Sequence, residues 1–313
     1  MSSRKWIIYS LILTTGLVSG FLISYVSAGS RQQEPITKII VEDYIEAPEY
    51  PSDLNFAGEI IPVDMFYIRE NFERELLVNT YWHSSTLLLL KRSTRWFPVI
   101  EPILKKNGIP DDFKYLCAIE SNLSQAKSPA GAVGFWQILE TTAKELGLEV
   151  TEDVDERYNV ERSTEAACKY FLKSYQKFGN WSLVAASYNA GTKKISELIA
   201  TQQASSYFDL LMPEETERYL FRILAIKLII QDPEAYGFKL DACDYYEPLE
   251  STEVKISGQV TSWTNFAKEH GITYKLLKIY NPWLRTDKLK NLAGKSYMLR
   301  LPAGEFSKIH QQN

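Results

Sequence analysis

The sequence contains few of the residues that build metal sites. Its cysteines and histidines are, in chain order, His83, Cys117, Cys168, Cys243, His270 and His310. The cysteines lack C-x-x-C spacing and the histidines stand far apart, so no zinc site is expected. Cys117 and Cys168 fall in helical patterns beside apolar neighbours, which favours small buried hydrophobic residues. A disulfide in an oxidising compartment remains the alternative.

A strong excess of either charge is also absent. The 313 residues include 35 Lys and Arg against 39 Asp and Glu, a net charge of −4. Nucleic-acid binding needs a basic surface that releases counterions, so a nucleic-acid partner is not expected. With 45% hydrophobic residues, the length suits two folded units with ordinary cores, which argues against a disordered or fibrous protein.

The long apolar run of this sequence lies near its N-terminus. Arg4 and Lys5 precede an uncharged stretch over residues 6–28. This pattern indicates export, and we expect residues 1–29 to be a signal peptide or a membrane anchor. Length favours an anchor with its basic flank inside, because a spanning helix needs about 20 apolar residues. A cleavage site at Val26-Ser27-Ala28 is the alternative, so the membrane is a partner only if the segment is retained.

Turn signals and apolar periodicity divide the rest of the chain. Residues 30–62 carry prolines and many acids without a sustained period, which predicts a linker. Over 63–236, apolar residues recur every three or four positions and almost nothing alternates with period two, which predicts a mainly α-helical domain. This domain opens with a long helical stretch over 63–107. A second linker, 237–252, leads to a small unit over 253–304.

The small C-terminal unit has a β-α-α-β pattern. A strand at 254–256 is expected to precede helices at 262–270 and 273–280, and a last strand is expected at 296–301. Roughly fifty residues are too few for an active-site cleft of their own. A binding module is therefore the natural expectation.

A carboxylate on an apolar helix face is the first candidate for chemistry. Pro110 marks a helix start, and Phe113, Leu116 and Cys117 follow it as an apolar stripe. Glu120 continues that stripe, so its side chain is expected on the core-facing side. Burying a charged carboxylate is costly, so Glu120 is either paired or has a raised pKa, which suits a general acid near neutral pH. The alternative is a salt-bridged structural residue.

A glycine-containing segment over residues 128–137 is the second candidate. Two glycines three residues apart, Gly131 and Gly134, allow the backbone to approach a ligand closely. Phe135 or Trp136 offers a ring face to a sugar. Gln137 offers an amide with donors and an acceptor. The alternative is a plain loop between two helices.

Two polar residues near helix ends complete the candidates. Asn189 lies just before Gly191, which can end a helix in the left-handed conformation. Asn189 is therefore either a capping residue or a side chain that holds a substrate amide or the carboxyl of Glu120. Tyr219 leads an apolar helix stripe, and its simplest interpretation is a core tyrosine.

Together these segments resemble a known catalytic domain. The matching motifs, in order, are Glu120-Ser121, Gly131-x-x-Gly134-x-x-Gln137, Ala186-x-Tyr188-Asn189-Ala190-Gly191 and Glu215-Thr216-x-x-Tyr219. Their order and spacing resemble the soluble-lytic-transglycosylase domain, which is related to goose-type lysozyme. The preceding segment, 81–110, looks like a membrane-bound subgroup of the lytic murein transglycosylases. The resemblance covers about 63–231 and implies a lysozyme-like α-helical fold.

The resemblance also implies a role for the matched residues. Glu120 is implied to be the only essential carboxyl, acting as both acid and base. Gly134, Gln137 and Asn189 are implied to line the saccharide groove, and Tyr219 is implied to position the acid.

Three further positions follow from the same motifs. Ser121 and Tyr188 are candidates for substrate binding. Trp136 stands where the family usually has methionine, so the neighbouring subsite is expected to differ in shape. The acids over 153–156 match no motif and are expected to form a solvated turn.

The C-terminal unit resembles a LysM domain, whose family binds the N-acetylglucosamine-containing backbone of peptidoglycan or chitin. Its opening departs from the family, because residues 259–263 replace the usual Gly-Asp-Ser/Thr turn. Glycan binding by this unit is therefore expected, with a degenerate packing module as the alternative.

These resemblances imply a peptidoglycan lytic transglycosylase in the periplasmic cell envelope. Its partners would be glycan strands, cut between N-acetylmuramic acid and N-acetylglucosamine with formation of 1,6-anhydro ends and without any cofactor or metal. Two alternatives remain: a hydrolytic muramidase of the same fold, and a non-catalytic protein that binds the cell wall.

Overall fold

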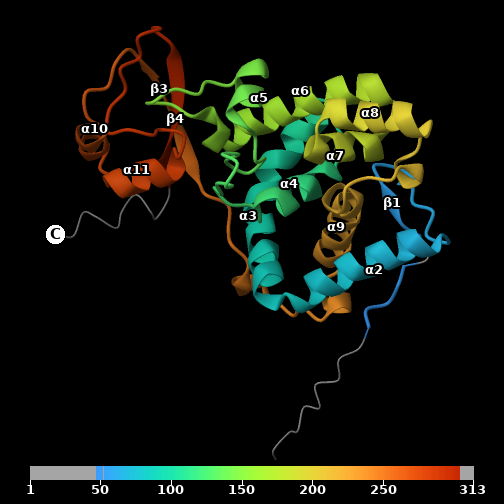
Figure 1. Cartoon of the computed structure of the whole chain (residues 1–313). Helices are drawn as coiled ribbons and strands as arrows, with labels where there is room; N and C mark the ends of the chain where they lie inside the picture. Colours follow the sequence, from blue (N-terminus) through green and yellow to red (C-terminus); the bar gives the residue numbers. More distant parts are fainter. Residues whose placement is uncertain (1–46, 52, 304–313) are drawn as a thin grey trace, which may run out of the picture. The chain divides into compact units, whose positions relative to one another are not determined.

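The structure is a computed structural model that describes residues 47–51 and 53–303 (Figure 1). The expected signal or anchor segment, 1–29, lies outside these residues. Within the described part, none of the helices combines the length and the apolar character needed to cross a membrane.

Helices dominate the described residues, as the periodicity predicts. In chain order, the larger domain contains β1 (Asn55–Phe56), β2 (Glu59–Ile60), α2 (Phe66–Tyr81), α3 (His83–Lys106), α4 (Phe113–Ser121), α5 (Glu140–Glu145), α6 (Val160–Phe178), α7 (Trp181–Ala190), α8 (Thr192–Gln202) and α9 (Glu214–Gln231). The prediction of a mainly α-helical domain is confirmed.

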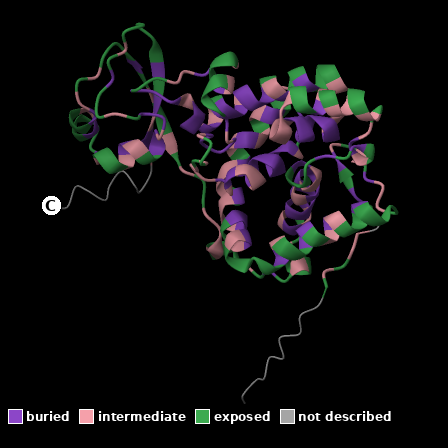
Figure 2. Cartoon of the chain, in the orientation of Figure 1, coloured by how far each residue is buried: buried purple, intermediate pink, exposed green. Residues whose placement is uncertain are grey.

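Helix α9 runs through the centre of the helical domain. Its Leu220, Ile223 and Leu224 are fully buried, and α2, α4 and α7 pack around it. Figure 2 shows buried residues on the facing sides of these helices. The start of α4 lies near the end of α9, where Asp112 pairs with Lys227, and the end of α4 that carries Glu120 meets the part of α9 that carries Tyr219, so the two helices run antiparallel.

The helical stretch expected over 63–107 consists of two helices. Trp82 separates α2 from α3 and has a non-helical backbone (φ −85°, ψ 58°). The hydroxyl of Thr86 donates to the carbonyl of Asn79 across this break, at 2.6 Å. The break lets α2 pack on α9 while α3 packs on α4 and α6, which one straight helix could not do.

The prediction of a linker over 30–62 is wrong for its last residues, 54–61. Phe56 and Ile61 are buried in the core of the helical domain, and β1 pairs with β2 as a short antiparallel hairpin. The Glu59 carboxylate accepts the backbone N–H groups of Trp181 and Ser182 at the first turn of α7. An acid at a helix N-terminus satisfies free N–H groups, so this hairpin is part of the folded domain.

The C-terminal unit has the predicted β-α-α-β order. Its elements are β3 (Ser251–Ser257), α10 (Trp263–Glu269), α11 (Tyr274–Tyr280) and β4 (Ser296–Pro302). The two strands pair antiparallel, with Ser251 opposite Pro302 and Ser257 opposite Ser296. Trp263 and Leu277 are fully buried in the core of this unit.

The acidic turn over 153–156 is not solvated, contrary to expectation. Asp153 and Asp155 are only 8% and 7% exposed. The Asp153 carboxylate accepts the backbone N–H of Lys290 and the hydroxyl of Thr286, and the backbone N–H of Asp155 donates to the carbonyl of Trp283. The turn is buried because it hydrogen bonds with the loop between α11 and β4.

The cysteines of the helical domain are unpaired. Cys117 and Cys168 are both buried and free. Burial also raises the pKa of the Cys168 thiol to about 12. The prediction of small buried hydrophobic residues is confirmed, and the disulfide alternative is wrong for this pair.

Candidate active site

Glu120 lies in the last turn of α4, just before Asn122 ends the helix in the left-handed conformation (φ 52°). Glu120 is half-buried, and the buried hydroxyl of Tyr219 donates a hydrogen bond to its Oε1. This contact joins α4 to α9 over a sequence separation of 99 residues. The expectation that the carboxyl faces the interior is confirmed.

Burial decides the protonation state of this carboxyl. Loss of solvation raises the pKa of Glu120 from 4.5 to about 7, the largest of the effects acting on it. The hydrogen bond from Tyr219 and the charge of Arg222 act in the opposite direction, and the charge of Glu215 adds to the rise. Among the described residues Glu120 forms no salt bridge, so the structural alternative is not favoured. A carboxyl with this pKa can donate a proton near neutral pH.

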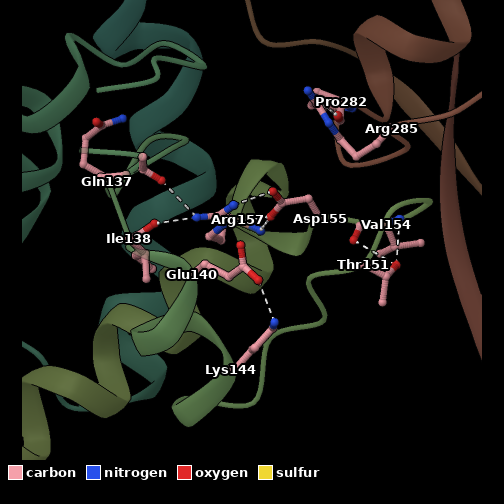
Figure 3. Close-up of polar contacts among 12 residues, drawn as sticks. Gln137, Ile138, Glu140, Lys144, Thr151, Val154, Asp155, Arg157, Pro282 and Arg285 are labelled. Carbon is pink, nitrogen blue, oxygen red and sulfur yellow. Dashed lines mark hydrogen bonds and ion pairs between the residues drawn. The ribbon is translucent and has the colours of Figure 1, made fainter. Parts of the chain in front are cut away.

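The glycine turn beside Glu120 is held by a buried ion pair. Arg157 binds both carboxylate oxygens of Asp155 at 2.8–2.9 Å and donates to the carbonyls of Gly131 and Ile138, each at 3.2 Å. Figure 3 shows Arg157 between Asp155 and the segment that carries Gln137 and Ile138. The carbonyls of Gly131 and Ile138 belong to the two ends of the turn that contains Gly134. By binding both of them, Arg157 holds the two ends of this turn together.

Gly134 is required by close packing of the backbone. Its φ is +80°, and a Cβ atom there would lie 2.1 Å from the carbonyl oxygen of Arg157. Gly134 therefore lets the backbone approach the Arg157 carbonyl closely, whereas the sequence predicted a close approach to a ligand. Gln137 also has a positive φ of 47°, and its amide nitrogen donates to the carbonyls of Ala126 and Gly134 at 3.1 and 2.8 Å.

The expectation that Phe135 or Trp136 offers a ring face to a sugar is wrong. Their side chains are 1% and 0% exposed. The indole N–H of Trp136 donates to the Thr164 hydroxyl of α6 at 2.8 Å, and the ring packs against Phe171. Trp136 replaces the usual methionine as a core residue, so its bulk is taken up inside the domain.

Ser121 and Tyr188 hold the backbone of the same turn. The Ser121 hydroxyl donates to the carbonyl of Phe135 at 2.8 Å, and the Tyr188 hydroxyl donates to the carbonyl of Trp136 at 2.6 Å. Burial strongly raises the pKa of the Tyr188 hydroxyl, with the charge of Glu120 as the next cause. Both residues therefore lie beside Glu120, with their hydroxyl protons directed at the protein backbone.

Asn189 joins the end of α7 to the start of α9. Its Oδ1 accepts the Thr216 hydroxyl at 2.8 Å, and its Nδ2 donates to Oε1 of Glu215 at 3.4 Å. Glu215 enters the sequence prediction only as the first residue of its motif, without a role. The signal for one was that Glu215 precedes Tyr219 by four residues and so lies on the same face of the helix. The carboxyl of Glu120 bonds with Tyr219 rather than with Asn189.

The structure thus brings the predicted residues together from three helices and one turn. Comparison with known families finds two matches along the chain. Residues 97–210 match the Transglycosylase SLT domain, and residues 252–305 match the soluble lytic transglycosylase C-terminal LysM-like domain. The chain therefore carries an SLT domain followed by a LysM-like domain. Tyr219 lies beyond the first match.

Individual proteins are also similar to parts of the chain. The membrane-bound lytic murein transglycosylases D of Escherichia coli strain K12 and of E. coli O6:H1 are each 29% identical over 238 residues, which cover 74% of this chain and 51% of the relative. The chain thus spans about half the length of these relatives. A solved structure, the 70 kDa soluble lytic transglycosylase of E. coli, aligns with 20% identity and a TM-score of 0.39, over 51% of this chain and 28% of that chain.

Proposed function

We propose that the protein is a peptidoglycan lytic transglycosylase with Glu120 as its catalytic acid and base. The observation that carries the proposal is the half-buried Glu120 carboxyl, whose pKa is raised to about 7 and whose Oε1 accepts the Tyr219 hydroxyl. Because Oε1 is occupied, Oε2 is the oxygen that would hold the proton for transfer. The SLT domain match and the named relatives support the same reaction.

In the first step Glu120 donates its proton to the oxygen that links C1 of N-acetylmuramic acid to N-acetylglucosamine. The C1–O bond breaks and an oxocarbenium-like centre develops at C1. The acetamido group of the same sugar would stabilise this centre through its carbonyl oxygen. This substrate assistance replaces the second carboxylate that most glycosidases use.

In the second step the ionised Glu120 removes the proton from the 6-hydroxyl of the muramyl sugar. The oxygen attacks C1, closes a 1,6-anhydro ring and regenerates the protonated acid. Protons balance without water. Tyr219 donates to Oε1 throughout, which fixes the carboxyl in one rotamer and stabilises its anionic form between the two transfers.

The saccharide groove is proposed to follow the glycine turn. The side-chain carbonyl oxygen of Gln137 and the second N–H of Asn189 would bind the N-acetyl substituents, because the other atoms of these amides are bonded within the protein. Gly134 sets the shape of the turn between them. Ser121 and Tyr188 are proposed as residues that hold this turn at the substrate, because their hydroxyls bind its carbonyls.

The LysM-like domain is proposed to bind the glycan strand beside the point of cleavage. This substrate places the reaction in the cell envelope, and retention of residues 1–29 would attach the protein to the membrane. Both statements rest on the domain match and on the apolar N-terminal run.

Digestion of purified sacculi tests the proposal. The purified full-length protein should release muropeptides that end in 1,6-anhydro-N-acetylmuramic acid, each lighter by one water than the corresponding reducing product in the mass spectrum. Glu120→Gln keeps the size of the side chain but has no proton to transfer, so it should release none. Glu73→Gln, an exposed change on α2, is the matched control and should act as wild type.

Each alternative gives a different result in this assay. A muramidase would release reducing ends. A non-catalytic wall-binding protein would release nothing in wild type and would be retained by sacculi with and without the Glu120 substitution. Either result would overturn the transglycosylase proposal.

A further inference from the structure

A buried carboxylate on α2 has no part in the mechanism described above. Glu75 is 1% exposed and lies at the packing surface between α2 and α9. Arg218 contacts its Oε1 at 2.5 Å, and Nε of Arg222 donates to its Oε2 at 3.4 Å. Burying a charged carboxylate costs free energy unless the charge is paired. Here two arginines of α9 compensate the charge of Glu75.

These two arginines flank the residue that binds the catalytic acid. Arg218 directly precedes Tyr219, and Arg222 follows it by three residues on the same face of α9. The charge of Arg222 also reaches Glu120, where it favours the ionised form of the carboxyl. Arg222 therefore has two anionic partners to choose between, Glu75 on α2 and Glu120 on α4.

Open space lies beside Arg222, between α2 and the last turn of α4. A cavity of about 310 Å³ lies beside the cluster, and its lining includes Glu75, Arg218, Arg222 and Ile119, the neighbour of Glu120. The Arg222 side chain is 32% exposed, so it is not locked by packing. In the described structure its Nε is directed at Glu75.

We propose that Glu75 is a positioning residue that holds the Arg222 guanidinium on the α2 side, away from the Glu120 carboxyl, so that the acid keeps its proton. This deepens the proposed function and rests on Glu120 being the acid. The inference reaches beyond the SLT match, because Glu75 and Arg222 lie on either side of residues 97–210.

The other groups that face Glu120 cannot take over the effect of Arg222 on its protonation. From α9 these are Tyr219, Arg222 and Glu215, from α7 Tyr188, and from α4 itself Cys117. Tyr188, Tyr219 and Cys117 all have strongly raised pKa values and remain neutral in the pH range of activity. Arg222 is thus the cation in this set, and the balance of charge at Glu120 depends on where Arg222 points.

The test is the pH dependence of kcat/KM for peptidoglycan release. Activity that needs a protonated Glu120 falls as pH rises through its pKa. Glu75→Gln frees Arg222 to approach Glu120, so this basic limb should move down by about one pH unit. Arg222→Gln removes the cation and should move the limb up. Glu73→Gln, the exposed partner of Arg69 on α2, is the matched control and should leave it in place.

Opposite shifts in the two variants distinguish positioning from general destabilisation, which would lower activity without moving the limb. An unmoved limb in Glu75→Gln, or a shift in the same direction as in Arg222→Gln, overturns the inference. If Glu75→Gln does not fold, the test is carried by Arg222→Gln alone, and an unmoved basic limb in that variant also overturns the inference.

A second measurement separates this inference from the proposed function. Carbon NMR of protein labelled in glutamate side chains follows the Glu120 carboxyl directly, with Glu120→Gln identifying its signal. If wild type releases no muropeptides, the transglycosylase proposal fails. The Glu75 inference then still stands or falls on whether Glu75→Gln lowers the titration midpoint of the Glu120 signal.

Discussion

Replacing Glu120 by glutamine should stabilise the protein increasingly as pH rises from 4.5, with the full effect above about pH 7. The folded state raises the pKa of this carboxyl from 4.5 to about 7, so between these values the folded protein binds more protons than the unfolded chain. The contribution of Glu120 to stability therefore falls as pH rises through this window and is least favourable above pH 7. Glutamine is neutral at every pH and removes this penalty.

The magnitude follows from the size of the shift. At about 1.4 kcal/mol per unit, a rise from 4.5 to about 7 corresponds to about 3 kcal/mol above pH 7. Partial solvation of the site makes this an upper figure. Glutamine retains an oxygen that can accept the Tyr219 hydroxyl, so little is lost in exchange. For a domain of this size the gain is worth several degrees in Tm.

Urea unfolding of wild type and Glu120→Gln at pH 8 and at pH 4.5 measures the effect. The variant should be more stable by about 2–3 kcal/mol at pH 8, and the difference should disappear at pH 4.5. Other groups titrate equally in both proteins and cancel. A variant that is less stable than wild type at pH 8 would refute the reasoning, because it would show that the ionised carboxyl stabilises the fold.

Three further substitutions test separate parts of the site. Tyr219→Phe removes the hydrogen bond that favours the ionised carboxyl, so kcat should fall about tenfold and the basic limb of the pH profile should move up; a downward shift would contradict this. Gly134→Ala places a Cβ against the carbonyl of Arg157 and should cost at least about 2 kcal/mol in chemical denaturation, so a neutral result would exclude the observed turn. Trp136→Met empties core volume and should lower stability by about 2 kcal/mol while leaving KM within about twofold; a large change in KM with unchanged stability would return Trp136 to the subsite.

The inward placement of Glu120, the proposed acid, was predictable because two independent signals in the sequence agree. Glu120 continues an apolar helix stripe, which indicates burial, and it begins the first of four ordered motifs. Tyr219 was assigned through the motif alone, since a buried tyrosine on an apolar stripe has no signal of its own. The two strands and two helices of the C-terminal unit were also predictable, because turn residues separate short segments of distinct period.

The errors come from contacts between distant segments. Phe135 and Trp136 follow a turn, where exposure is the usual expectation, but the turn folds inward, so that Phe135 packs against Trp96 of α3 and Trp136 against α6. The acids Asp153 and Asp155 read as solvated because two partners of this turn, the Thr286 hydroxyl and the Trp283 carbonyl, lie far away in the sequence. Local periodicity carries no information about such pairings.

The N-terminal hairpin was missed for a related reason. Prolines and acids before residue 62 suggest a linker, and the two strands are only two residues each. The apolar residues Phe56 and Ile61 bury against helices that lie far away in the sequence. Glu59, which caps α7, is likewise one acid among many until its partner is known.

Direct titration of the Glu120 carboxyl in the wild-type protein tests the account most simply. With glutamate side chains labelled at the carboxyl carbon, the signal absent from Glu120→Gln should titrate with a midpoint near pH 7 and show a protonated carboxyl at pH 6. A midpoint near 4.5, the value of an ordinary solvated glutamate, would mean that the group has no proton to give at neutral pH and would contradict its role as the acid.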